Sequence, residues 1–89
     1  MQRTADLSIP NKYGLHARPA AEFVKLANRF SSDIRVRKED VEVSGKSIMG
    51  VMMLAAEFGS TITITADGED SEAAIDALSG LVAGGFGEE

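Results

Sequence analysis

Apolar and polar residues alternate in four segments of the chain, a pattern that predicts half-buried β-strands. The clearest is the segment TITITA, in which apolar residues alternate with β-branched threonines. The predicted strands are 3–9, 34–37, 41–44 and 61–66. A hairpin turn is expected at 38–40, although it lacks the Asn-Gly or Asp-Gly pair that favours the tightest hairpins.

Three other segments carry apolar residues at spacings of three and four, which predicts amphipathic helices. In the first, which begins near His16, the apolar positions are Ala20, Phe23, Val24, Ala27 and Phe30. In the second, a short helix from about 47 to 54, they are Ile48, Val51, Met52 and Ala55. In the third, they are Ala74, Ile75, Leu78, Leu81 and Val82.

Polar residues and glycines mark the two ends of the third helix. We expect Asp70 or Ser71 to cap its start and Gly84-Gly85 to end it, leaving a tail at 86–89. The predicted element order is therefore β-α-β-β-α-β-α. Because each strand has one apolar face and each helix one apolar stripe, this order favours an α+β fold, an open-faced two-layer sandwich with the helices on one face of an antiparallel sheet.

Length and composition narrow the function classes. A chain of 89 residues fits one domain, and a net charge of -5 argues against nucleic acid as a partner. The absence of cysteine and the presence of one histidine disfavour a disulfide framework and a protein-built zinc site. Since no apolar run is long enough to be a signal peptide or to span a bilayer, we expect a cytoplasmic protein without membrane insertion.

The single histidine, His16, lies directly before the first predicted helix. Pro19 suits the first turn of a helix, and Gly14 allows a sharp turn from the preceding strand. A helix start leaves its first amides without intrahelical partners at the positive end of the helix dipole. The amides of Ala17 and Arg18, with the Arg18 guanidinium, could therefore bind a phosphate beside the imidazole.

An uncharged imidazole has a lone pair that can attack phosphorus, and phosphoryl transfer depends mainly on positioning and on charge stabilisation. A lone histidine at a helix start is also a common capping or packing residue. A basic patch of Lys12, His16, Arg18 and Lys46 could face an acidic partner protein, or these charges could simply be scattered and solvated. Ser47, before the second helix, is first of all a candidate N-cap.

Two motifs together identify a family resemblance. Residues 14–20, GLHARPA, resemble the phosphorylation site of HPr, the histidine-containing phosphocarrier family of the bacterial phosphoenolpyruvate-dependent phosphotransferase system. Residues 45–52, GKSIMGVM, resemble the family's regulatory-serine segment, at the matching spacing. The resemblance covers essentially the whole chain and implies four strands and three helices. The turn at 38–40 departs from the family, which often has Asn-Gly there.

The resemblance implies a phosphocarrier rather than an enzyme. His16 would accept a phosphoryl group on Nδ1 from enzyme I and pass it to enzyme IIA components for sugar uptake. Ala17 and Arg18 would stabilise the group, and the partners would supply the catalysis. The chain itself would need no cofactor and no metal. We expect a monomer, since a carrier must exchange partners.

The second motif implies regulation and docking. Ser47 would be phosphorylated by a serine kinase/phosphorylase in some bacteria, which changes the surface charge that partners meet. Ile48, Met49 and Met52 would form a patch beside His16 that binds donor and acceptors. A short helix cannot bury every apolar face, so we expect at least Met49 to be exposed.

Three alternatives remain open. A nitrogen-related branch of the same family has a similar site at 11–20 and a similar acidic tail at 85–89, although residues 46–52 look more like the sugar branch. A small regulatory domain of α+β type could bind an anion on the loop 14–19 without covalent change. An autonomous enzyme would have little catalytic apparatus, with one histidine and no obvious carboxylate pair.

Overall fold

The computed structural model describes residues 1–87, and the predicted element order is confirmed over this range. A short 3-10 turn follows the last helix. The elements are β1 (Gln2–Ser8), α1 (Ala17–Ala27), β2 (Asp33–Lys38), β3 (Val41–Ser44), α2 (Ile48–Met53), β4 (Thr61–Asp67), α3 (Ser71–Ala83) and η1 (Gly85–Gly87).

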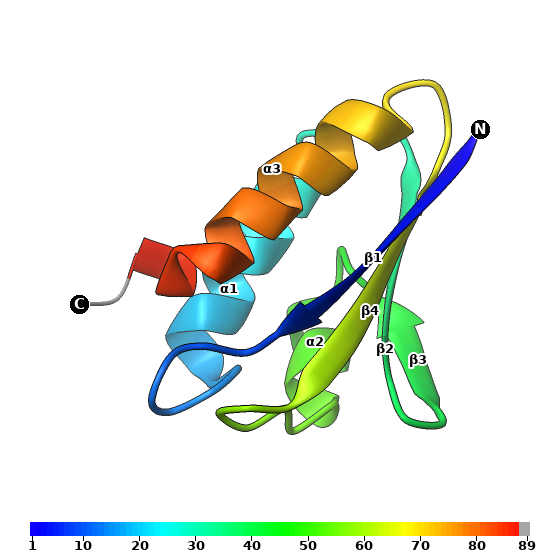
Figure 1. Ribbon diagram of the computed structural model, residues 1–89. Coiled ribbons are helices and arrows are strands. Elements are labelled where there is room, and N and C mark those ends of the chain that lie inside the picture. Colours follow the sequence, from blue (N-terminus) through cyan, green and yellow to red (C-terminus); the bar gives the residue numbers. More distant parts are fainter. Residues whose placement is uncertain (88–89) are drawn as a thin grey trace.

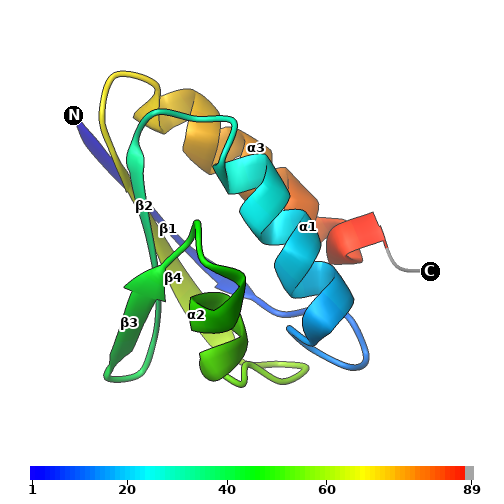
Figure 2. The ribbon, with the colours of Figure 1, turned by 180° about the vertical axis from the view of Figure 1, so that it is seen from behind.

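Within residues 1–87, four strands form one antiparallel sheet in the order β1-β4-β2-β3. β4 is central, and its strict alternation is explained because Ile62, Ile64 and Ala66 all point into the core. α1 and α3 lie side by side as a layer against the sheet, while α2 packs beside α1 next to β3 (Figures 1 and 2). The predicted open-faced two-layer sandwich is confirmed.

The core lies between these layers. The predicted apolar stripes of α1 and α3 are largely confirmed, with Phe23 and Leu78 almost fully buried. Phe30 lies beyond the end of α1 and is half-buried. The prediction of a tail after the third helix is wrong at Phe86, because this side chain is buried. Gly85 and Phe86 both have positive φ (70° and 60°), and the chain therefore turns back onto the core. Residues 88–89 of that predicted tail lie outside the described residues.

The stripe predicted for α2 is only partly correct. Val51 is buried, but Ile48 and Met52 are exposed, and so is Ala55. The helix ends at Met53, and Ala55 takes a positive φ of 51°, which turns Ala56 into the core in its place. α2 therefore presents most of its apolar side chains to solvent.

Asp70 is the N-cap residue of α3, as expected, but its side chain makes no capping hydrogen bond there. Its carboxylate instead accepts hydrogen bonds from the backbone N–H groups of Ser31 (2.8 Å) and Ser32 (3.0 Å) and from the Ser32 hydroxyl. The hydrogen bond from the Ser32 hydroxyl has the largest effect and that from the Ser31 amide the next largest, and they lower the pKa of Asp70 to about 2. The carboxylate thus ties the turn before β2 to the start of α3.

The predicted hairpin between β2 and β3 has a tight two-residue turn, because Lys38 pairs with Val41. Glu39 supplies the positive φ, 55°, that a glycine or asparagine usually provides.

Candidate functional site

Residues 10–15, which lie between β1 and α1, form the site loop, and two hydrogen bonds join Asn11 to Gly14 within it. The backbone N–H of Gly14 donates to Asn11 O (3.2 Å), and the Asn11 side-chain amide donates to Gly14 O (2.8 Å). Gly14 has a φ of 71°, and a Cβ placed there would lie 2.4 Å from Ala56 O. Both the conformation and the close approach therefore require glycine.

Leu15 anchors the end of the site loop next to His16. Its side chain is buried, and its backbone N–H donates to Ala56 O (2.9 Å) in the segment after α2. The backbone of Leu15 and Gly14 thus rests on the chain that connects α2 with β4. Because this contact lies one residue before His16, it fixes the point at which α1 begins.

His16 is the N-cap residue of α1, as predicted, and its side chain is exposed. Its backbone is extended, and its carbonyl accepts the first intrahelical hydrogen bond, from Ala20 N (2.9 Å). The imidazole makes no capping hydrogen bond to the first turn of α1, all of which lies in the described range. The amides of that turn are therefore left for another acceptor.

These amides belong to Ala17 and Arg18, the first two residues of α1. Neither has an intrahelical acceptor in an α-helix, and the third residue, Pro19, has no N–H. The two donors lie at the positive end of the helix dipole, directly after the histidine. Arg18 is exposed, and its guanidinium forms no ion pair within residues 1–87. The arrangement suits a phosphoryl group bonded to the imidazole.

Two residues of the site loop flank the imidazole. The Tyr13 ring meets the His16 ring edge-on, with centroids 6.2 Å apart and an interplanar angle of 83°. The Lys12 ammonium lies 5.3 Å from the centroid of the Tyr13 ring. Lys12 was expected in the basic patch, but the contact between Tyr13 and His16 was not predicted. The position of Tyr13, three residues before His16, was the feature of the sequence that could have indicated it.

Lys46 does not belong to this basic patch, and that part of the prediction is wrong. Its ammonium donates to Phe30 O (2.7 Å), beyond the C-terminal end of α1. His16 lies at the opposite end of this helix, whose 11 residues span about 16 Å. The patch therefore reduces to Lys12, His16 and Arg18.

Ser47 is the N-cap of α2, as predicted, and its Oγ accepts a hydrogen bond from Gly50 N (3.0 Å). The predicted docking patch of Ile48, Met49 and Met52 is exposed, and Met53, which was not predicted, is exposed beside it. α2 packs against α1 with its C-terminal end toward the site loop, because Ala56 accepts from Leu15 (Figure 2). The C-terminal end of α2, which carries Met52 and Met53, therefore lies toward the site loop that precedes His16.

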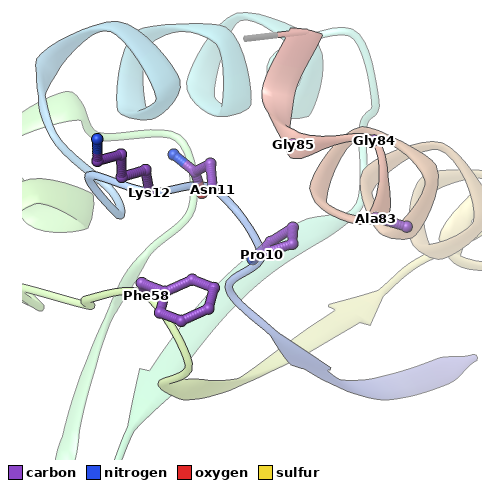
Figure 3. Close-up of a pocket in the computed structure, with 7 residues that line it drawn as sticks. All are labelled: Pro10, Asn11, Lys12, Phe58, Ala83, Gly84 and Gly85. Carbon is purple, nitrogen blue, oxygen red and sulfur yellow. The ribbon is translucent and has the colours of Figure 1, made fainter. Parts of the chain in front are cut away.

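A cavity of about 540 Å³ lies between the site loop, Phe58 and the end of α3. Figure 3 shows Pro10 between Phe58 and the Ala83–Gly85 segment, with Asn11 and Lys12 above them. His16 is not among the described residues that line this cavity. Its side chain is exposed, so another protein could reach the imidazole.

The described residues show no metal-binding group: in 1–87, no three His, Cys, Asp or Glu side chains lie together in a way that could hold an ion. No helix in the same range is long and apolar enough to cross a membrane.

Comparisons with known proteins agree with the geometry. The family profile described as "PTS HPr component phosphorylation site" matches residues 3–84. The phosphocarrier protein HPr of Cupriavidus necator is 51% identical over 83 residues, which is 93% of each chain. The crystal structure of HPr-C-His from Thermoanaerobacter tengcongensis superposes with a TM-score of 0.94, at 48% identity over 98% of each chain. An HPr dimer from the same organism gives a TM-score of 0.79, at 50% identity, over 92% of this chain and 94% of that one.

Proposed function

Because the chain belongs to the HPr family of phosphotransferase-system carriers, we propose that His16 is the residue on which it carries the phosphoryl group. The observation that carries this proposal is the exposed imidazole directly before the amides of Ala17 and Arg18, which have no intrahelical acceptor. No other histidine is present in the sequence. The whole of 1–89 would act as one phosphocarrier domain.

In the proposed reaction, the lone pair of the His16 ring nitrogen attacks phosphorus on enzyme I. A new N–P bond forms as the bond between phosphorus and the donor breaks. The oxygens of the transferred group would accept hydrogen bonds from the amides of Ala17 and Arg18, and the guanidinium would balance their charge. We propose Nδ1 as the nitrogen that carries the group, as the family resemblance implies. The transfer to an enzyme IIA component is the same step in reverse, and the partners would supply the remaining catalytic groups.

We propose that these partners bind the docking patch of Ile48, Met49 and Met52, extended by Met53. Exposed methionines can adapt to several surfaces, which suits a carrier with different donors and acceptors. Lys12 and Arg18 would add attraction for an acidic partner. The working carrier would be a cytoplasmic monomer. The HPr dimer from T. tengcongensis makes the oligomeric state a point to measure.

Ser47 is the proposed regulatory residue, through a serine kinase/phosphorylase. A phosphate on its Oγ would remain at the N-terminal end of α2, where its negative charge is tolerated within the domain. The added charge would lie next to Ile48 and Met49. We therefore expect phosphorylation to change partner binding more than folding.

A reconstituted transfer tests the proposal. Labelled phosphoenolpyruvate, enzyme I and a catalytic amount of the chain are combined with an excess of an enzyme IIA from the sugar branch or from the nitrogen branch. We expect label on the sugar-branch acceptor only when the wild-type chain is present, and none with His16→Ala. Label passing faster to the nitrogen-branch acceptor would assign the chain to that branch. No label on either, with an active enzyme I, would contradict the proposed function.

A further inference from the structure

All four methionines of the chain are exposed, although methionine is usually a buried residue. The exposed fractions are 78% for Met1, 73% for Met49, 39% for Met52 and 72% for Met53. The last three belong to α2, a helix of 6 residues. Since the chain has no cysteine, its sulfur lies entirely in these thioethers, and most of it lies on one helix.

We propose that the α2 methionines form an oxidation site for peroxides that reversibly weakens the transfer of the phosphoryl group. A hydroperoxide transfers one oxygen atom to the thioether sulfur: the S–O bond forms as the O–O bond breaks, and water or an alcohol leaves. Sulfur is oxidised and the peroxide is reduced. Methionine sulfoxide reductases reverse this change. The consequence for transfer depends on the docking patch of the proposed function.

The structure separates an effect on docking from an effect on folding. The side chains by which the α2 region enters the core are those of Val51 and Leu54, and the cap of the helix is the Ser47 hydroxyl. None of these contains sulfur. A sulfoxide on Met49 or Met53 therefore stays in water in the free protein. When a partner covers the patch, the sulfoxide oxygen loses its water, and an unmatched polar group of this kind weakens association by about tenfold.

Exposure also predicts the order of oxidation. Met49 and Met53 are four residues apart, on the same face of α2, and should react at similar rates. Met52 is about half as exposed and should react more slowly. Met1 is an internal control: it is the most exposed of the four, but it precedes β1 at the end of the sheet far from α2 (Figure 1).

The experiment treats the whole protein with hydrogen peroxide and maps the sulfoxides by peptide mass spectrometry. Transfer from enzyme I is measured before and after treatment, for wild type, for Met1→Leu and for the triple variant Met49→Leu, Met52→Leu, Met53→Leu. Each protein is compared with its own untreated state. We expect a loss of about tenfold in wild type and Met1→Leu, recovery with methionine sulfoxide reductase, little loss in the triple variant, and unchanged thermal unfolding.

Unchanged transfer in wild type that carries sulfoxides at Met49 and Met53 would overturn the inference. An equal loss in the triple variant, or a lowered melting temperature that parallels the loss, would overturn it as well. These outcomes leave the proposed function intact, because the untreated protein reports on it separately. A chain that accepts no phosphoryl group before treatment would instead contradict the proposed function.

Discussion

Replacing Gly14 with alanine tests whether the contact between the site loop and Ala56 is as tight as the structure indicates. Two costs are expected. The first is conformational: an alanine at a φ of 71° costs about 1–2 kcal/mol, partly offset because alanine also restricts the unfolded chain. The second is steric, since the new Cβ would lie 2.4 Å from Ala56 O and 2.9 Å from Glu57 Cα, both of them backbone atoms that cannot rotate away.

Relief of this overlap requires the two segments to separate. Forced overpacking of this kind costs about 1–3 kcal/mol, and the weakened Leu15–Ala56 hydrogen bond adds about 1 kcal/mol. We therefore expect Gly14→Ala to lower the free energy of unfolding by about 3 kcal/mol in total. For a domain of this size, the melting temperature would fall by roughly 12–24 °C.

Gly59→Ala is the matched control. Gly59 also has a positive φ, 86°, but among residues 1–87 no atom outside its chain neighbours lies within 4 Å of the position that a Cβ would take. It should lose only the conformational part, about 1 kcal/mol. Urea unfolding followed by far-ultraviolet circular dichroism measures both variants. Equal losses of stability in the two variants would refute the steric reasoning.

Three further predictions concern stability. Ser47→Ala removes the acceptor for Gly50 N and should lower the free energy of unfolding by about 1 kcal/mol. Ser47→Asp keeps an acceptor and should retain most of the stability. Urea titrations measure both variants, and equal losses of stability would contradict the capping role of Ser47. Gly80→Ala, in the exposed interior of α3 with open space for a Cβ, should stabilise the protein by about 1 kcal/mol, and a lower urea midpoint would contradict this. Asp70→Asn should be less stable than wild type at neutral pH. Because the pKa of Asp70 is lowered to about 2 in the folded protein, the carboxylate's contribution is fully present above about pH 4 and is lost as the pH falls toward 2. Thermal unfolding across this range should show the gap narrowing, and a gap independent of pH would contradict the role of the carboxylate.

The fold was predictable in segments where burial follows a regular pattern along the chain. The alternation in 61–66 predicts β4 correctly because one face of this strand is buried. The apolar stripe from Ala20 to Ala27 predicts α1 correctly because one face of this helix is buried. The start of α1 at His16 was also predictable, since Pro19 is a local signal for the first turn. The position of the first-turn amides follows directly from that start.

The errors at Lys46, Asp70 and Phe86 have a common physical cause, which is contact between segments far apart in sequence. Lys46 donates to Phe30, so its charge lies away from His16. Asp70 binds the turn at Ser31 and Ser32 and not its own helix. Phe86 folds back onto the core through two consecutive residues of positive φ. Such contacts leave no periodic signal in the sequence.

The most direct test of the central claim is the intact mass of the chain after incubation with phosphoenolpyruvate and an active enzyme I. The account predicts the mass of one added phosphoryl group, which is lost in acid, as expected for a phosphohistidine. His16→Ala should keep the unmodified mass. An acid-stable adduct, or an adduct of equal yield on His16→Ala, would contradict the assignment of His16 as the carrier residue.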